Sequence, residues 1–277
     1  MRIMLSKLSL TDRSYVIGLF QGDGSLEENT RNRGRLSYEI SKGDADIVYK
    51  LADVFKPHVN VFVHERTRST NFKDSHESIS LTIHNMEFRR ELNEFVPYGR
   101  KAAIIAPPCD LSERDYIRGL IDADGSLGLT EKGRCFISLC TSSEKIKEYM
   151  LASILRVVGR RKSLNRNKRD NVYNIVLFDE DAQVYASFLY KGAGLYIDRK
   201  HEKYLEIMEW ERTSDRARIL RKMWLPSEDI IALSSDTSLE EKMDVLDRTA
   251  QSIKMRIWRL KRKSIVDELR PIVNVKG

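Results

Sequence analysis

The sequence predicts an α+β fold with two similar halves, followed by a small all-α domain, and three observations indicate it. Residues 16–24 align without a gap with residues 117–125, which lie 101 positions later in the 277-residue chain. Similar predicted helices and strands follow both copies, whereas the C-terminal segment shows helical spacing only. We therefore expect two pseudo-symmetric αββαββα halves, 1–105 and 106–204, whose sheets form one saddle-shaped surface, and a helical domain over 205–277.

Each copy is expected to be a short helix that packs against the other copy. Small residues recur four positions apart, on one helical face, as Gly18 and Gly22 in the first copy and Gly119 and Ala123 in the second. A glycine inside a helix costs roughly 1 kcal/mol relative to alanine, so its presence indicates close approach of two backbones. Residues 11–14 are predicted to supply the N-cap of the first helix.

The ends of these helices are expected to bring two acids together. Gly24 and Gly125 are predicted to end the helices in the left-handed conformation, which leaves Asp23 and Asp124 in the last turns, at the negative ends of the helix dipoles. Two adjacent carboxylates repel each other unless protons or hard cations such as Mg²⁺ lie between them. The sequence therefore predicts a divalent-metal site, although a duplicated packing helix without chemistry is the alternative.

Both copies resemble the motif of the LAGLIDADG homing endonucleases, in the single-chain form that carries two motifs. The resemblance implies a β-saddle that binds a long double-stranded DNA target, and metal-dependent hydrolysis of both strands. It implies that Asp23 and Asp124, with the adjacent Gly22 and Ala123, hold Mg²⁺ or another divalent cation such as Mn²⁺. Bacterial transcription regulators that carry a decayed version of this domain show that the fold also occurs without catalysis.

Four further positions are candidate catalytic residues by the same resemblance. The motif's earlier acid is Asp122 in the second copy but Gln21 in the first, so the two active sites are expected to be unequal and to nick one strand faster. The family places a basic residue near each scissile phosphate, and Lys101 and Lys200 occupy similar positions, 78 and 76 residues beyond the aspartates. The arginine before each lysine is an alternative for this contact, and an ordinary exposed lysine is the plainer interpretation.

The segments between the motifs alternate as strands and helices require. Apolar Leu36, Tyr38 and Ile40 alternate with polar residues and are predicted to face the core. After a polar loop over 25–34, the first half is predicted to contain strands over 35–41, 59–68 and 78–83 and helices over 44–55 and 86–95. The second half is predicted to contain strands over 135–140, 163–166 and 172–177 and helices over 143–158 and 180–190.

One face of these strands is polar and is the predicted DNA-binding surface. A β-ribbon fits the major groove, and basic side chains beside it neutralise phosphates in a salt-sensitive way. The predicted contacts are Arg35, Ser37, Glu39, Arg66 and Arg68 in the first half, and Ser138, Arg161, Lys162, Arg166, Lys168 and Arg169 in the second. A solvated run of charges is the alternative interpretation of the basic turn in the second half.

Composition limits the class of protein. The chain has 48 Lys and Arg residues against 41 Asp and Glu, and the resulting charge of +7 favours a polyanionic partner. Three cysteines and five histidines show neither a disulfide framework nor zinc spacing. The sequence shows no transmembrane run, signal peptide or Walker loop, so we expect a cytoplasmic protein with direct access to DNA.

Three short helices are predicted near the C-terminus, after a charged helical connector over 202–222. The first begins near Ser227, the second spans 238–246, and the third follows an Arg-Thr pair and is basic. This order, with a tryptophan before an acidic first helix, resembles a Myb-like helix-turn-helix, which implies DNA contacts by Arg248, Lys254, Arg256 and Arg259. The alternative is an amphipathic tail that packs on the preceding domain.

These expectations combine into one leading function and two alternatives. We expect a monomeric, metal-dependent, site-specific endonuclease that cuts double-stranded DNA. A non-catalytic DNA-binding transcription regulator derived from the same fold is the first alternative. An RNA maturase that helps a host intron to splice is the second.

Overall fold

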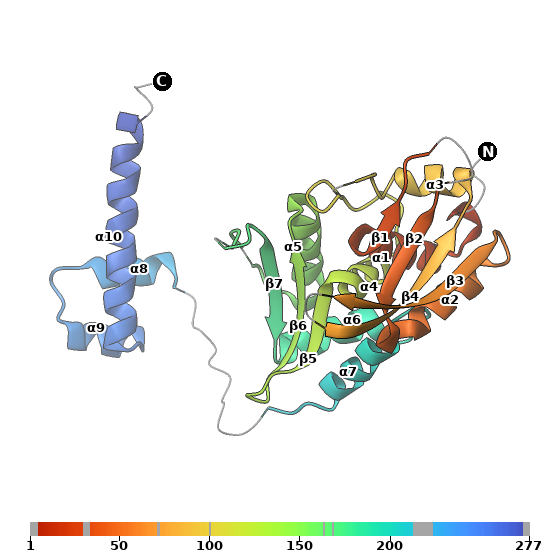
Figure 1. Cartoon of the computed structure of the whole chain (residues 1–277). Coiled ribbons are helices and arrows are strands. Elements are labelled where there is room, and N and C mark those ends of the chain that lie inside the picture. The colour runs from red at the N-terminus through yellow and green to blue at the C-terminus, as the bar shows by residue number, and fades with distance from the viewer. Residues whose placement is uncertain are drawn as a thin grey trace. The chain divides into compact units, whose positions relative to one another are not determined.

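The computed structural model describes residues 5–29, 34–70, 73–99, 101–162, 164–167, 169–212 and 224–273, without the side chains of 68–70, 73–76, 226 and 262–273 (Figure 1). Its contacts divide the chain into two compact units, Met1–Thr213 and Ser214–Gly277. The first unit extends past residue 204 because helix α7 (Asp198–Met208) packs against α6 (Glu180–Tyr190) and β5 (Gly125–Leu129). None of the described helices has the length and apolarity needed to cross a membrane.

The first half has the predicted order αββαββα. Its elements are α1 (Leu10–Gly22), β1 (Gly24–Leu26), β2 (Leu36–Ser41), α2 (Ala45–Phe55), β3 (Val61–Thr70), β4 (Lys73–Ile83) and α3 (Met86–Asn93), with 3-10 helices at Leu5–Lys7 and Lys42–Asp44. The strands form an antiparallel sheet in the order β1-β2-β4-β3. Strand β1 occupies the start of the predicted loop, because Leu26 pairs with Leu36 and is buried.

The second half repeats this order with one strand fewer in its described residues. Its elements are α4 (Glu113–Asp124), β5, β6 (Cys135–Thr141), α5 (Glu144–Val158), β7 (Tyr173–Phe178), α6 and α7, and its sheet has the order β5-β6-β7. The prediction of a strand over 163–166 is wrong for the described residues 164–166. There the Arg166 guanidinium donates to Asn171 O and Ser142 O, at 2.7 and 3.0 Å, so side chains hold the segment where a backbone ladder was expected.

Strand alternation places the core as predicted. Leu36 and Tyr38 are fully buried and Ile40 is partly buried, while the residues between them face the other side of the sheet. Burial of such side chains is the main favourable contribution to folding. A single hydrophobic cluster includes residues of both halves, among them Phe20 of α1 and Ile121 of α4. The two halves of the first unit therefore share one core.

Glycines allow α1 and α4 to touch. A Cβ added at Gly18 would lie 2.2 Å from the backbone oxygen of Tyr116, and one added at Gly119 would lie 2.3 Å from the backbone oxygen of Tyr15. Either distance is far inside van der Waals contact, so a larger residue would push the helices apart. The predicted close packing of the two motif helices is confirmed.

The helix ends differ from the prediction in two respects. Helix α1 begins earlier than residues 11–14 imply, because Ser9 is the N-cap and its Oγ accepts a hydrogen bond from Asp12 N at 3.0 Å. Gly24 and Gly125 are not left-handed; each begins a strand. They are required by crowding, since a Cβ would lie 2.4 Å from Phe20 Cδ1 at Gly24 and 2.7 Å from Ser138 O at Gly125.

The second unit contains three helices in its described part, α8 (Pro226–Leu233), α9 (Leu239–Leu246) and α10 (Ala250–Val273). Helix α9 begins with a capping box, in which Glu241 N donates to Ser238 Oγ and Ser238 N donates to Glu241 Oε2. Ala232, Leu246 and Ile253, one from each helix, form its buried core. This unit therefore has a small core of its own.

Candidate active site

The two motif aspartates lie at the adjacent C-terminal ends of α1 and α4. Asp23 is the C-cap residue of α1, and Asp124 is the last residue of α4. The helices are so close here that a Cβ added at Gly22 would lie 2.3 Å from Ala123 Cβ and 3.1 Å from Asp124 Oδ2. Gly22 and Ala123 therefore act as spacers that bring the two carboxylates to one place.

The surroundings of both aspartates disfavour their charged form. Each side chain reaches solvent, but the protein around it removes enough water to raise the pKa of Asp23 and of Asp124 above the usual range. The charge of Asp23 raises the pKa of Asp124 further, whereas Lys101 and Lys200 lower both. A bound cation would relieve this repulsion, as the sequence predicts.

Lys101 and Lys200 occupy equivalent positions beneath the two helix ends. Lys101 Nζ donates to Phe20 O at 2.7 Å and also to Gly24 O. Lys200 Nζ donates to Ile121 O at 2.6 Å and to Gly125 O at 3.1 Å, and these two acceptors lie 101 positions after the acceptors of Lys101. Each lysine thus neutralises the carbonyl end of the helix that carries its half's aspartate.

Burial makes both lysines easier to deprotonate than an ordinary lysine. Desolvation lowers the pKa of Lys101 to about 8, against the opposing effect of Asp23 and Asp124. Lys200 is only 5% exposed, and burial lowers its pKa as well, opposed mainly by Asp122. The alternative interpretation, an ordinary exposed lysine, therefore applies to neither residue.

The arginine next to Lys200 has a different partner. Arg199 forms a bidentate ion pair with Asp44, at 2.8 Å from Nε to Oδ1 and 2.7 Å from Nη2 to Oδ2. Arg100, the corresponding residue of the first half, lies outside the described residues. In the second half, therefore, Lys200 donates to the carbonyl groups at the helix end, and Arg199 pairs with Asp44 of the first half.

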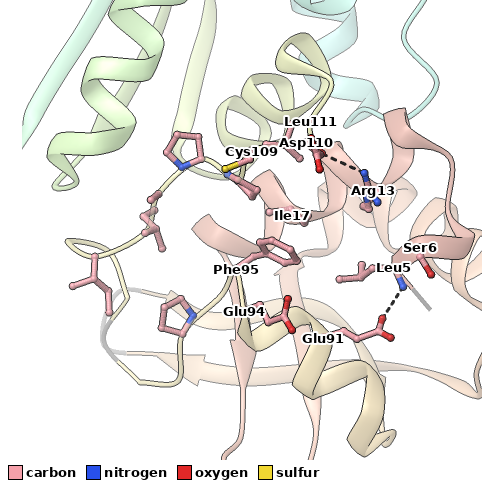
Figure 2. Close-up of a pocket in the computed structure, with 16 residues that line it drawn as sticks. Leu5, Ser6, Arg13, Ile17, Glu91, Glu94, Phe95, Cys109, Asp110 and Leu111 are labelled. Atoms are coloured by element: carbon pink, nitrogen blue, oxygen red, sulfur yellow. Dashed lines mark hydrogen bonds between the residues drawn. The ribbon is translucent and has the colours of Figure 1, made fainter. Parts of the chain in front are cut away.

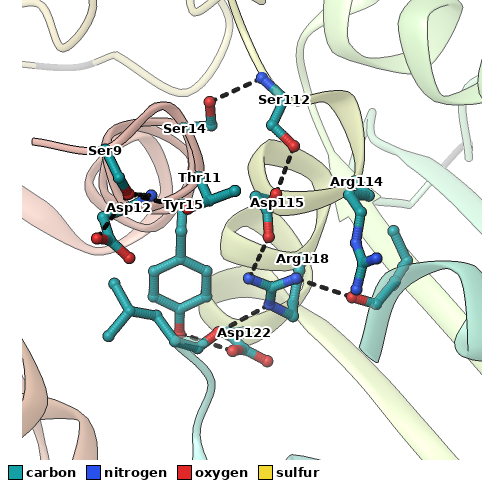
Figure 3. A network of polar contacts seen from close by, with 12 residues as sticks. Ser9, Thr11, Asp12, Ser14, Tyr15, Ser112, Arg114, Asp115, Arg118 and Asp122 are labelled. Atoms are coloured by element: carbon teal, nitrogen blue, oxygen red, sulfur yellow. Dashed lines mark hydrogen bonds and ion pairs between the residues drawn. The ribbon is translucent and has the colours of Figure 1, made fainter. Parts of the chain in front are cut away.

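Asp122 and Gln21 are buried, and each accepts a hydrogen bond from a tyrosine of the other motif helix. Figure 3 shows Asp122 beside Tyr15. Asp122 accepts hydrogen bonds from Tyr15 Oη at 2.7 Å, Tyr190 Oη at 2.6 Å and Ile197 N at 3.1 Å. Burial raises the pKa of Asp122, and Lys200 and the two tyrosines oppose that effect. The structure therefore places Asp122, a predicted catalytic residue, in a buried hydrogen-bond network.

Gln21 occupies the equivalent place in the first half, but it donates hydrogen bonds to its own surroundings, whereas Asp122 accepts them. Its Nε2 donates to Phe95 O and Ala106 O, both at 2.9 Å, and its Oε1 accepts from Tyr116 Oη at 2.6 Å. A carboxylate cannot donate to two carbonyl oxygens, whereas an amide can. The exchange of aspartate for glutamine thus follows from local hydrogen bonding. It also leaves the first half without the charge that Asp122 places near Lys200, and the inequality of the two active sites stays a prediction.

The donor set at the helix ends fits a hard divalent cation. Asp23 and Asp124 supply carboxylate oxygens, and Gly22 and Ala123 lie in the last helical turns, whose carbonyl oxygens lack partners within the helix. Within the described residues, no group of three or more His, Cys, Asp or Glu side chains is placed to hold a metal ion. Mg²⁺ commonly uses one or two carboxylates together with water and substrate phosphates, so two are sufficient.

The first sheet presents most of its predicted DNA contacts on one face. Ser37 and Glu39 alternate with the buried residues of β2, and the strand register places Arg66 on the same face, beside Ser78. Glu39 accepts a hydrogen bond from Ser78 Oγ at 2.7 Å, and Arg35 pairs with Glu27 at 2.6 Å. The side chain of Arg68 lies outside the described part of the structure.

The basic turn of the second half is only partly available to a partner. Lys162 donates to Val176 O at 2.6 Å, Arg166 is held by Asn171 and Ser142, and Arg169 pairs with Asp170 at 2.8 Å. Arg161 is exposed, and Ser138 on the sheet face donates to Ser126 O at 3.2 Å. Lys168 lies outside the described residues.

Sequence reasoning missed an aromatic group on the same face of the first sheet. Phe62 is 45% exposed and contacts His64 and His84, with ring centroids 6.5 and 5.8 Å apart. The register pairs Phe62 with Thr82, which in turn pairs with Ser37. The period-two alternation of Phe62, His64 and Arg66 was the signal available in the sequence.

Two of the four basic residues predicted to bind DNA in the second unit serve its fold. Arg248 pairs with Glu228 at 2.8 Å and Arg256 pairs with Asp229 at 2.6 Å, while both guanidinium groups lie over the Trp224 ring, at 4.0 and 5.6 Å from its centroid. Only 6% of the Arg248 side chain is exposed. Lys254 and Arg259, in contrast, lie on the exposed side of α10. Arg248 and Arg256, predicted to contact DNA, thus contact acids and Trp224 of their own unit.

A cavity of about 480 Å³ lies away from the two aspartates, in the first unit (Figure 2). It is lined by residues of α1, α3 and the connection between the halves, including Ile17, Phe95 and Cys109. At its edge, Leu5 N donates to Glu91 Oε2 at 2.9 Å and Arg13 donates to Asp110 O at 3.2 Å. None of the predicted site residues lines it.

Comparison with known proteins agrees with this architecture. No family model matches the sequence, and no curated protein matches it. Among solved structures, the homing endonuclease I-WcaI bound to its DNA recognition sequence is similar, with a TM-score of 0.51, 14% identity, and coverage of 71% of this chain and 87% of that one. The I-SmaMI LAGLIDADG homing endonuclease bound to cleaved DNA (TM-score 0.46, 12% identity, 74% and 88% covered) and the N-terminal LAGLIDADG domain of DUF199/WhiA (0.44, 13%, 68% and 87%) are similar to a lesser degree. The chain therefore has the α+β fold of a homing endonuclease, as the sequence predicts.

Proposed function

We propose that this protein is a divalent-metal-dependent, site-specific endonuclease of the single-chain LAGLIDADG type that hydrolyses both strands of a DNA duplex. One observation carries the proposal. Asp23 and Asp124 lie side by side at the ends of two packed helices, and an equivalent lysine, Lys101 or Lys200, donates to the carbonyl groups of each helix end. A duplicated site of this kind matches a substrate whose two strands present two phosphodiester bonds.

The roles follow from the chemistry of the side chains. Asp23 and Asp124, with the carbonyl groups of Gly22 and Ala123, would hold Mg²⁺ or Mn²⁺. When bound, such a cation lowers the pKa of a water molecule and stabilises negative charge at phosphorus. Lys101 and Lys200 fix the helix ends through their carbonyl contacts and contribute positive potential where the phosphates approach.

The two sheets supply the surface for the duplex. The polar face that carries Ser37, Glu39 and Arg66 in the first half, and Ser138 in the second, suits the major groove, and Arg161 is available for phosphates. The net charge of +7 favours a polyanion. The second unit would act as a helix-turn-helix that lengthens the site, through Lys254 and Arg259 on α10. The protein would work as a monomer, in a compartment that contains DNA.

The test uses duplexes enriched by binding to the full-length protein from a randomised pool. The wild-type protein is expected to cut both strands of an enriched duplex with Mg²⁺ and neither strand with EDTA. Asp23→Asn and Asp124→Asn are each expected to abolish cutting while binding is retained. Asp53→Asn is the matched control, because Asp53 is an exposed acid of α2 whose recorded partner is Lys56.

Other results would point to the alternative functions. Tight binding of a duplex without cutting, under every divalent metal supplied, would support the non-catalytic DNA-binding regulator. Preference for a structured intron RNA over every duplex would support the maturase.

A further inference from the structure

A bidentate ion pair joins the two halves beside one of the aspartates. Asp44 is the N-cap residue of α2 in the first half, and Arg199 lies in the first turn of α7 in the second half, 155 positions later. The Asp44 side chain is 11% exposed, whereas the Arg199 side chain is 56% exposed. The acid is thus fixed in the protein, and the guanidinium it holds faces outward.

Both members of the pair line the same cavity as the proposed catalytic residues. This cavity, of about 240 Å³, is lined by Asp23, Asp44, Arg199 and Lys200, together with Asp122, Ser126 and neighbouring residues. A guanidinium at its wall therefore lies within reach of whatever approaches Asp23 and Lys200.

The pairing leaves Arg199 able to bind a second anion. A guanidinium has five N–H groups, and Asp44 takes one from Nε and one from Nη2. For Arg199, the described residues record no other hydrogen bond. An arginine oriented by a carboxylate on one edge presents its remaining donors in a fixed plane, the geometry that suits a phosphate group.

The equivalent place in the other half is built differently. There the N-cap residue of α5 is Ser143, whose Oγ donates to Ile105 O at 2.7 Å. A serine hydroxyl carries no charge and cannot hold a guanidinium through two parallel hydrogen bonds. Among the described residues, a carboxylate at this N-cap position holds an arginine on one side of the pseudo-twofold axis only.

We propose that Asp44 is a positioning residue that holds Arg199 against a phosphate group of one DNA strand, beside Asp23 and Lys200, and so promotes the cleavage of that strand alone. This inference rests on the proposed endonuclease function. It adds Asp44 and Arg199 to Asp122 and Gln21 as a source of inequality between the two active sites.

If the pair only joined the two halves, weakening another contact between the same two helices would have the same effect on cleavage. The same two helices are also joined by Lys50, which pairs with Asp198 at 2.5 Å, and by Asp198 N, which donates to Asp46 Oδ2 at 2.8 Å. Asp198 does not line the cavity. Asp198→Asn is therefore the matched control, since it weakens the contact between the halves without touching Arg199.

The experiment follows the two strands separately. A duplex cut by the wild-type protein carries a different label on each strand, and the rates are measured under single-turnover conditions for Asp44→Asn, Arg199→Lys and Asp198→Asn. Asparagine has nearly the size of aspartate, and the Asp44 side chain makes no capping hydrogen bond, so Asp44→Asn removes the charge without removing a cap. Loss of one charge-assisted phosphate contact corresponds to a rate change on the order of tenfold.

The expected result is a roughly tenfold slower cut of one strand by Asp44→Asn and Arg199→Lys, with the other strand within about twofold of wild type. Asp198→Asn is expected to leave the ratio of the two rates unchanged. Equal slowing of both strands by Asp44→Asn, or an unchanged ratio, would overturn the inference and leave the endonuclease function standing. A wild-type protein that cuts neither strand would instead remove the proposed function itself. Melting temperatures of the three variants show whether any slowing reflects loss of fold.

Discussion

Tyr15 on α1 donates a hydrogen bond of 2.7 Å to Asp122 on α4, across the interface of the two motif helices. The reciprocal contact runs from Tyr116 on α4 to Gln21 on α1, at 2.6 Å. Both tyrosines are fully buried, and both pairs are related by the 101-residue repeat. Each motif helix thus supplies the donor for the buried polar residue of the other.

Replacing Asp122 with asparagine is expected to destabilise the protein by about 1–3 kcal/mol. Three donors point at the Asp122 carboxylate, and an amide group would turn an N–H toward one of them. The buried Lys200 would also lose the negative charge that most favours its protonated form. Urea denaturation measures the free energy of unfolding. Asp124→Asn, two residues later and exposed, is the matched control, and a loss of similar size there would contradict the prediction.

Gly18→Ala is expected to cost about 1–3 kcal/mol or more, because its Cβ would lie 2.2 Å from the backbone oxygen of Tyr116. Gly43→Ala is the control, since a Cβ there has no neighbour within 4 Å. Thermal unfolding of the two variants compares them directly. If Gly18→Ala melts with Gly43→Ala, the helices are not in the contact described.

Lys101 predicts a stability that depends on pH between about 8 and 10.5. The pKa of Lys101 falls from 10.5 in the unfolded chain to about 8 in the folded protein, so in this range the unfolded chain binds one proton more. Burial of the charged lysine therefore destabilises the fold most below pH 8, and this contribution is relieved as the pH rises. Lys101→Met should remove this part of the pH dependence in denaturation measured at pH 7.5, 9 and 10. A cleavage step that uses the charged lysine should slow above about pH 8.

Mg²⁺ is expected to raise the melting temperature of the wild-type protein. The raised pKa of Asp23 and of Asp124 means that their ionisation opposes folding at neutral pH, and a cation bound between them relieves that effect. At 100 times its Kd, a ligand stabilises the folded state by about 2.7 kcal/mol. Asp124→Asn should show a smaller shift with Mg²⁺, while Asp53→Asn should match the wild type. A shift of the same size in all three would place the metal elsewhere.

Basic residues of the second unit are expected to separate into two classes. Lys254→Ala should weaken DNA binding several-fold and lower its salt dependence, because one phosphate contact is lost from an exposed side chain. Arg248→Ala should instead unfold the second unit, because it removes a buried pair with Glu228 and the contact with Trp224. Circular dichroism and binding titrations on the full-length chain distinguish the two. A folded Arg248→Ala variant with reduced affinity would contradict this division.

The sequence was most informative where a pattern repeats. The duplicated glycine faces predict the packing of α1 on α4, and the alternation of Leu36, Tyr38 and Ile40 predicts the inner face of β2. The strand predicted over 163–166 does not form in its described part, where Arg166 donates to the backbone oxygen of Ser142, 24 positions earlier. Apolar spacing carries no information about such a contact.

The site was predictable in its composition more than in its geometry. The distance of Lys101 and Lys200 from the aspartates predicts equivalent lysines, but their burial against helix-end carbonyls depends on the folded arrangement. Asp122 was interpreted as a catalytic acid because a motif shows which residue is present and not which way it points. The pair of Asp44 and Arg199 spans 155 positions and has no repeat to reveal it.

The tyrosine contacts of the motif helices have a consequence for the symmetry of the molecule. Tyr15 and Tyr116 are both donors, and Gln21 and Asp122 both accept, so two identical copies of either half would satisfy the same bonds. The centre of the molecule is thus isologous, like the interface of a symmetric homodimer, although the other hydrogen-bond partners of the two acceptors differ.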